Sequence, residues 1–126
     1  MPPLRVGCPM WAHRPWVGRW YPVSTRSGSE LGLYARLCNA VEGNTTFYAS
    51  PKEDVLRRWR QVMPAGFRFL PKLPKAVTHD GLLTEKTERA AAFAWHLSAL
   101  GGRLGPCFAQ LPPYFEAERL GLEVGW

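Results

Sequence analysis

The chain has 126 residues, a hydrophobic content of 46% and a formal net charge of +6. This length suits a single domain, residues 1–126, and the hydrophobic content excludes an intrinsically disordered protein. The first 75 residues hold 12 Lys and Arg against 4 Asp and Glu, whereas residues 76–126 hold 4 against 6. A basic first half can attract phosphate or nucleic acid, but these charges stand mostly alone, which is typical of solvated helix faces.

The three cysteines, Cys8, Cys38 and Cys107, lie far apart in the sequence, and none belongs to a CxxC pair. This spacing excludes the common zinc motifs, and an odd number of cysteines argues against a disulfide framework. The sequence contains no apolar run of about 18 residues and no stretch that resembles a signal peptide. We therefore expect a soluble cytoplasmic protein without a metal, a cofactor or a membrane partner.

The N-terminal part predicts a short strand followed by a long loop. Residues 4–8 are apolar enough for a strand, which Pro9 would end. Residues 11–22 combine several Trp and Arg side chains. Such a loop can stack on bases or sugars, or it can close one end of a barrel.

A helix is predicted over residues 30–39. Ser27 or Ser29 can cap its start, and Glu30 lies favourably near the positive end of the helix dipole. Its apolar residues recur at helical spacing and predict a buried face: Leu31, Leu33, Tyr34, Leu37 and Cys38.

The next segment, residues 40–46, predicts a strand with an unusual polar face. Side chains alternate along a strand, so Glu42, Asn44 and Thr46 point one way and Val41 points the other. A buried carboxylate costs several kcal/mol unless it is paired or hydrogen-bonded. The segment is therefore either a solvent-facing edge strand or one wall of a functional site.

A second helix is predicted after this strand. Ser50 and Glu53 have the spacing of a capping box, with Pro51 at the first helical position. The helix would end before Pro64. Its predicted apolar face consists of Val55, Trp59 and Val62.

Two further strands and one helix follow in alternation. Residues 67–70 predict a third strand, and the proline-rich loop after it carries Lys72 and His79. A helix is predicted over residues 87–100, capped by Thr84 or Thr87 and ended by the glycines at 101–102. Its predicted buried residues are Phe93, Leu97 and Leu100. Residues 104–110 predict a fourth strand.

Strands that alternate with helices indicate an α/β fold with a parallel sheet. No glycine-rich phosphate loop of the GxGxxG or GxxxxGK type occurs, so a nucleotide-binding doubly wound fold is not favoured. In α/β barrels, the active site is built at the carboxyl ends of the strands. Trp11, residues 42–48, residues 72–79 and Gln110 fall at those positions in the predicted strands.

Four sequence blocks carry a resemblance to a known family. In order, they are VGCPMW with WYP, then NAVEGNTTFYASP, FRFLPKLPKAVTH and FAQLPPYF. Together they resemble the YecE-like family (domain of unknown function 72) over nearly the whole chain. The resemblance implies a TIM-type barrel whose activity is not established. It also implies the family's motif positions: Glu42, Asn44, Thr46, Phe47, Tyr48, Lys72, His79 and Gln110.

The chain departs from the family pattern in places. Gly43 stands where a large aliphatic residue is usual, so we expect a gap towards the helices and a stabilising effect of Gly43→Val. Pro71 removes a backbone donor from the third strand. A closed eight-stranded barrel needs roughly 250 residues, so the chain is expected to form a truncated barrel of about four β/α units. Such a half-barrel has open edges, and we expect it to complete itself as a homodimer.

Three classes of function follow from these features. The first is an enzyme that acts on a small polar or anionic ligand. Its predicted catalytic residues are Glu42, Lys72 and His79, and its predicted ligand-binding residues are Trp11, Asn44, Thr46, Tyr48 and Gln110. The second is a non-catalytic half-barrel that self-associates, and the third is a nucleic-acid-binding protein. The site hypothesis predicts that the side-chain ends of Glu42, Lys72 and Gln110 share one cavity.

Overall fold

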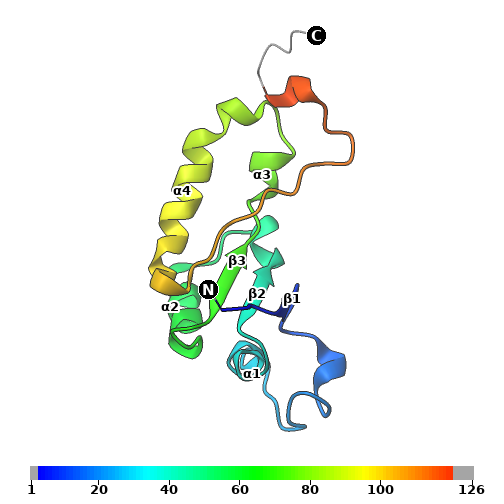
Figure 1. Ribbon diagram of the computed structural model, residues 1–126, viewed down its shortest axis with the longest axis vertical. Coiled ribbons are helices and arrows are strands. Elements are labelled where there is room, and N and C mark those ends of the chain that lie inside the picture. Colours follow the sequence, from blue (N-terminus) through cyan, green and yellow to red (C-terminus); the bar gives the residue numbers. More distant parts are fainter. Residues whose placement is uncertain (1–2, 121–126) are drawn as a thin grey trace.

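Three short parallel strands form the sheet of this α/β fold. They are β1 (Gly7–Cys8), β2 (Ala40–Gly43) and β3 (Arg68–Pro71), and they lie in the order β1-β2-β3. The computed structural model describes residues 3–120 (Figure 1). The first strand is shorter than predicted. The Leu4 and Val6 side chains are exposed and do not pack against the core.

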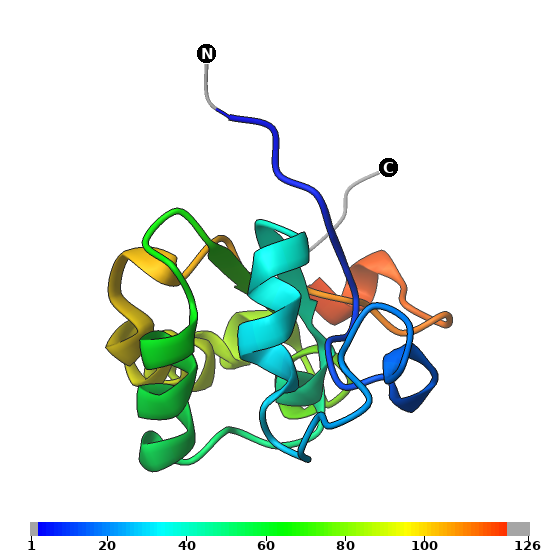
Figure 2. The same cartoon turned by 90° about the horizontal axis from the view of Figure 1, so that it is seen from below.

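The helices are α1 (Glu30–Leu37), α2 (Glu53–Val62), α3 (Lys75–Thr78) and α4 (Thr87–Leu97). The first two helices alternate with the strands, as the sequence predicts, whereas α3 and α4 both follow β3, and α3 lies in the segment predicted as a loop. Short 3₁₀ helices cover Arg14–Trp16, Asn44–Phe47, Leu83–Glu85, Ser98–Arg103 and Ala117–Leu120. Figure 2 shows α1 and α2 on the same side of the sheet. In the described part of the chain, every helix falls short of the length and apolar character that a membrane span requires.

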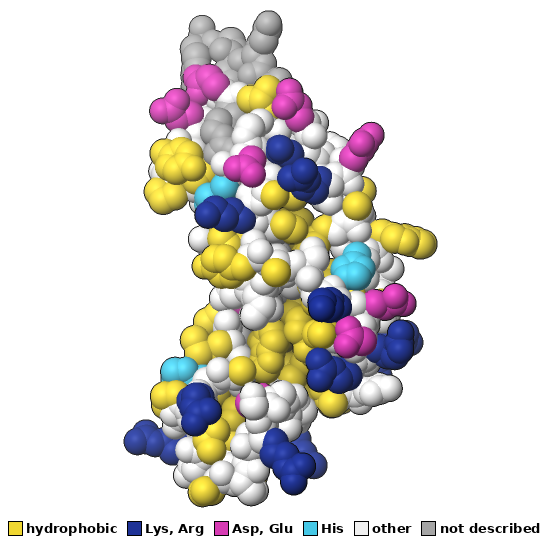
Figure 3. All heavy atoms as spheres, turned by 180° about the vertical axis from the view of Figure 1, so that it is seen from behind, with side chains coloured by type: hydrophobic (Ala, Val, Ile, Leu, Met, Phe, Trp, Pro, Cys, Tyr) yellow, Lys and Arg dark blue, Asp and Glu magenta, His cyan; other side chains and the backbone are white. Residues whose placement is uncertain are grey.

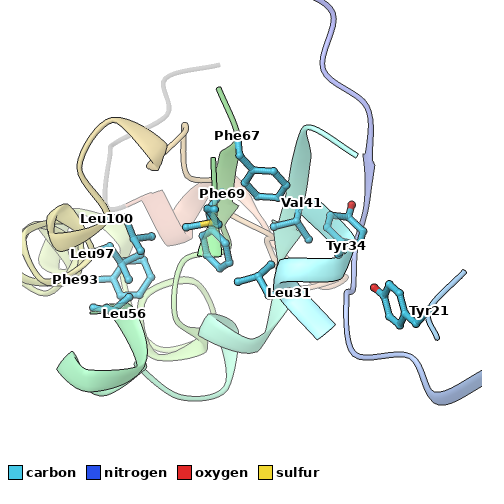
Figure 4. Close-up of a cluster of buried hydrophobic side chains, with 11 residues drawn as sticks. Tyr21, Leu31, Tyr34, Val41, Leu56, Phe67, Phe69, Phe93, Leu97 and Leu100 are labelled. Carbon is cyan, nitrogen blue, oxygen red and sulfur yellow. The ribbon is translucent and has the colours of Figure 1, made fainter. Parts of the chain in front are cut away.

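The hydrophobic core lies between the sheet and these helices. Val41 of β2 and Phe69 of β3 point into it, which confirms the predicted orientation of Val41. The predicted polar face does not continue past Glu42, because Asn44–Phe47 form a 3₁₀ helix rather than strand. The predicted buried residues of the last helical segment, Phe93, Leu97 and Leu100, gather around Leu56 of α2 (Figure 4). The apolar periodicity therefore identified this helix correctly.

Two buried tyrosines tie the N-terminal segment to the core. The Tyr34 hydroxyl donates to Ala40 O (2.7 Å) and accepts from Cys8 N (2.6 Å), so one side chain of α1 links β1 to β2. The Tyr21 hydroxyl donates to Trp11 O (2.6 Å). Burial raises the pKa of Tyr21 to about 12 and raises the pKa of Tyr34 as well.

None of the predicted side-chain caps forms. The backbone N–H of Gly28 donates to the Glu30 carboxylate (2.8 Å), and the Ser29 hydroxyl turns back to Arg26 O (2.6 Å). At the start of α4, the N-cap residue is Lys86, without a side-chain cap. These local bonds are alternatives that Ser and Thr side chains commonly adopt near helix starts.

The capping box at Ser50 is also wrong. Helix α2 begins at Glu53, and its N-cap residue Lys52 is extended, with φ −69° and ψ 158°. The Pro51 carbonyl lies 2.5 Å from His96 Nε2 of α4, so this carbonyl has a partner outside α2. The buried residue of α2 is Leu56, whereas the predicted face residue Val62 is exposed.

The predicted fourth strand is not regular. Residues 104–108 lie beside β3 in the parallel direction, joined by isolated bridges from Phe69 to Leu104 and from Lys72 to Phe108. The two bridges are three residues apart along β3 and its exit, but four residues apart along residues 104–108. Pro71 and Pro106 lie inside this stretch and have no backbone donor, so the ladder cannot run through it continuously.

The gap expected beside Gly43 is not present. A Cβ atom built on Gly43 would lie 2.4 Å from Phe69 Cζ and 2.5 Å from Phe69 Cε1. The Phe69 ring is itself fixed between Trp59 (ring centroids 5.0 Å apart, stacked) and Trp11 (5.8 Å). The expectation that Gly43→Val stabilises the fold is therefore wrong, because an aromatic side chain of the neighbouring strand already fills the space.

Candidate functional site

Three polar side chains meet at the carboxyl ends of the strands. Glu42 lies on β2, Lys72 directly follows β3, and Gln110 follows the segment beside β3. The Lys72 Nζ atom donates to Gln110 Oε1 (2.6 Å) and lies 3.7 Å from Glu42 Oε1. The geometry thus brings together the three residues that the site hypothesis names, around a single ammonium group.

The environment of this ammonium is partly apolar. The Lys72 side chain is 11% exposed, and that of Glu42 is 34% exposed. The Lys72 Nζ atom lies 5.6 Å from the centre of the Phe47 ring and 5.9 Å from that of Phe108, within range of cation–π attraction. An ammonium has three N–H donors, and Gln110 takes one of them. The group can therefore direct another donor to a bound molecule.

A groove on the sheet face opposite the core reaches one charged member of this cluster, Glu42. Lys72 and Gln110 do not line it, so the prediction that all three side-chain ends share one cavity holds only for their mutual contact. The volume of the groove is about 640 Å³, and Glu42, Leu70 and Phe108 are among the residues that line it. At the other end of the strands, Arg68 Nη1 donates to Ala65 O (2.9 Å), so this arginine is held by the backbone. Glu42 is the acidic side chain that lines the groove, and it is the reachable partner of Lys72.

Two further predicted residues hold the strand ends in place. The Thr46 side chain is fully buried, and its Oγ1 lies 2.8 Å from Gly43 O and 2.7 Å from Lys72 O. Asn44 Nδ2 donates to Pro9 O (3.1 Å). The Asn44 Oδ1 atom is buried without a hydrogen-bond partner among the described residues. Thr46 therefore positions backbone rather than ligand, whereas Asn44 retains an unused acceptor.

The remaining predicted residues lie outside the cluster. His79 Nδ1 contacts Thr78 Oγ1 (2.8 Å), and its ring packs against Phe47 (5.2 Å). Tyr48 is 80% exposed beside Phe47. Trp11 packs edge-on against Trp59 (5.4 Å) in the core, which supports the packing role for its loop. No hydrogen bond or ion pair among residues 3–120 joins any of these three to Lys72.

One member of the cluster was missed from the sequence. Phe108 pairs with Lys72 across the strand ends and places its ring beside the ammonium. It stands two residues before Gln110, so in an extended segment both side chains share one face. This alternation could have identified Phe108 as a neighbour of Lys72 from the sequence.

Metal ligation is not supported by the arrangement of side chains. Within the described residues, no three His, Cys, Asp or Glu side chains are placed to hold a metal ion. Glu42 lies beside a lysine, which competes for its carboxylate. The cluster is better suited to recognise a polar or anionic group.

The chain matches the family described as "Protein of unknown function DUF72" over residues 5–124. It is similar to the UPF0759 protein YecE of Escherichia coli (strain K12), with 38% identity over 93% of this chain and 40% of YecE. Its structure is similar to the DUF72 family protein TM1631 of Thermotoga maritima, with a TM-score of 0.71 and 25% identity. The match covers 91% of this chain and 47% of TM1631.

A second solved structure shows likeness in fold alone. The DUF72 family protein EF0366 of Enterococcus faecalis aligns with a TM-score of 0.66 and 22% identity. The match covers 90% of this chain and 42% of EF0366. The chain thus spans less than half the length of these relatives.

Proposed function

We propose that this chain, which belongs to the DUF72 family, carries a ligand site of an enzyme. The enzyme would act on a small polar or anionic molecule. The observation that supports this most is the nearly buried Lys72 ammonium, shared by Glu42 and Gln110 at neighbouring strand ends. We place this site at the carboxyl ends of a TIM-type barrel of which the chain supplies about half. The parallel strand order and the greater length of the relatives support that placement.

Each residue of the cluster has a role that fits its chemistry. Lys72 would hold an anionic group or a developing negative charge, because its surroundings strengthen electrostatic attraction. Gln110 would orient the ligand through its amide. Glu42 is reachable from the groove and can act as a general acid or base. The groove of about 640 Å³ is large enough for a metabolite-sized ligand.

The alternative role for Lys72 and Glu42 is structural. An ion pair with one partner nearly buried contributes little to stability relative to a well-packed apolar pair, because desolvation offsets the attraction. The Phe47 and Phe108 rings beside the ammonium could also pack against an apolar side chain of similar length. A cluster kept for stability alone would therefore not need a lysine at this position.

Lys72→Met tests the proposal directly. We expect the free energy of unfolding to change by less than about 1 kcal/mol, because methionine keeps the apolar contacts and Glu42 stays partly hydrated. Binding of inorganic phosphate or acetate, measured by NMR titration of the ¹⁵N-labelled protein, should weaken at least about tenfold. Equal binding by the wild type and the variant would contradict the proposal. Lys52→Met, at an exposed position before α2, is the matched control.

A second candidate function is self-association of the half-barrel as a homodimer. Strand β1 ends the strand order, and among the described residues its outer edge pairs with no other strand. Such an edge invites pairing with another chain, and a second copy would present the same open sheet. Light scattering should give about twice the chain mass of 14.2 kDa. A folded species of 14.2 kDa at micromolar concentration would rule out the dimer.

The nucleic-acid alternative has weaker support. On the face seen in Figure 3, Lys and Arg side chains are dispersed, and several lie close to Asp or Glu. Binding to a phosphate backbone usually needs a continuous basic surface. This face offers none.

A further inference from the structure

A second cavity lies next to the Lys72 cluster and shares Phe47 with it. Its volume is about 760 Å³, and it includes none of Glu42, Lys72 and Gln110. We propose that this cavity binds a small planar molecule that carries a phosphate or carboxylate group. The cavity is formed by the loop after β2, by α3 with the turn that follows it, and by α4.

The planar part of the ligand would stack on Tyr48. This side chain is 80% exposed, so the core does not depend on it. Its ring stands at 90° to the Phe47 ring, with the centroids 5.0 Å apart, and Phe47 is held in turn by His79 at 5.2 Å. An exposed aromatic ring on a fixed aromatic support is a suitable platform for a second flat ring.

The anionic part of the ligand would meet Lys75 and Arg89. Both line the cavity, from α3 and α4 respectively, and both are exposed. Neither forms an ion pair among the described residues, and Asp80 is the acidic side chain that lines the same cavity. The local charge therefore favours an anion, and the planar guanidinium of Arg89 matches the oxygens of a phosphate or a carboxylate.

Apart from the Ser50 hydroxyl, the rest of the wall is apolar or already bonded. Phe93 is the buried apolar residue of the lining, and His96 is fixed by its contact with Pro51 O (2.5 Å). A pocket with an apolar lining, an aromatic side and a few cationic groups is typical of sites for aromatic anions. The assignment goes beyond the function proposed for Lys72, because it depends on different residues.

Titration of the ¹⁵N-labelled full chain separates the parts of this proposal. Phenyl phosphate and benzoate each carry a ring and an anionic group, whereas inorganic phosphate carries only the charge and phenol only the ring. We expect phenyl phosphate or benzoate to shift the backbone signals of residues 47–50, 75–80 and 89–96, and to bind at least about tenfold more tightly than inorganic phosphate and phenol. The stronger of the two ligands identifies the anionic group. Equal affinity for phenyl phosphate, benzoate and inorganic phosphate would overturn the proposal.

Substitutions then locate the binding groups. Tyr48→Ala should weaken binding about tenfold and Arg89→Gln about threefold, with melting temperatures close to that of the wild type. Trp95→Ala removes an equally exposed ring and Arg58→Gln an exposed charge outside the cavity, and they should leave affinity unchanged. Unchanged affinity in both cavity variants would disprove the site. Lys72→Met should leave the shifts that phenyl phosphate and benzoate cause at residues 47–50, 75–80 and 89–96 unchanged, so failure here is distinguishable from failure of the function proposed above.

Discussion

Replacing Gly43 with Val is expected to lower the free energy of unfolding by about 3 kcal/mol or more. The first added carbon would lie 2.4 Å from Phe69 Cζ, which is far inside contact distance. Phe69 cannot move away easily, because it is fully buried and stacks on Trp59 with Trp11 at its edge. Either the aromatic stack or the pairing of β2 with β3 must give way, and close-packed interiors resist both changes.

Urea denaturation followed by tryptophan fluorescence measures this effect. Gly66→Ala is the matched control, because a Cβ atom at that exposed glycine would meet nothing within 4 Å. Combining Gly43→Ala with Phe69→Leu should cost less than the sum of the two single changes, since the smaller side chain leaves room for the methyl group. A melting temperature of Gly43→Val above that of the wild type would show that the ring yields at little cost.

The sequence predicted the phase of β2 because alternation needs only neighbouring residues. Val41 points into the core and Glu42 into the groove, as expected. It also predicted that Glu42, Lys72 and Gln110 meet, since parallel strands bring their carboxyl ends to one edge of the sheet. These predictions depend on the alternation of side chains along a strand and on the parallel order of the strands, and local sequence patterns indicate both.

Predictions that depended on how distant side chains pack failed at Gly43 and at Ser50. The space beside Gly43 is decided by Phe69, whose ring orientation depends on Trp59 and Trp11. The segment before α2 contacts His96, which lies in another helix and which the local pattern at Ser50 does not reveal. Local propensity gave Ser50 the features of a cap, but α2 begins at Glu53, after this tertiary contact.

The irregular fourth segment has a different cause. The prolines of this segment and of β3 can be read from the sequence, and the loss of a backbone donor at Pro71 was expected. What the sequence did not show is that the register would slip by one residue between the two bridges. Register depends on which backbone groups find partners in three dimensions, and prolines on both paired segments remove donors that would otherwise define it.

Thr46→Val is expected to lower the free energy of unfolding by about 2 kcal/mol. Thr46 was predicted to bind ligand, but its buried hydroxyl lies between Gly43 O and Lys72 O and joins the ends of β2 and β3. Gly43 O still accepts from Lys72 N (3.2 Å) without this hydroxyl. The Lys72 carbonyl oxygen loses the Thr46 hydroxyl as its donor and would face a methyl group instead. The 2.7 Å between these two positions suits a hydrogen bond but is too short for a methyl contact.

Thermal and urea denaturation of three variants decide between a positioning role and a ligand-binding role for this threonine. Thr46→Ser keeps the hydroxyl and should retain most of the stability, whereas Thr45→Val, at the exposed neighbouring position, should change it by less than about 0.5 kcal/mol. Because Lys72 O belongs to the residue that carries the ammonium, Thr46→Val should also weaken phosphate or acetate binding at Lys72, although the hydroxyl itself is buried. Thr46→Val with wild-type stability would show that the two strand ends hold together without this hydroxyl.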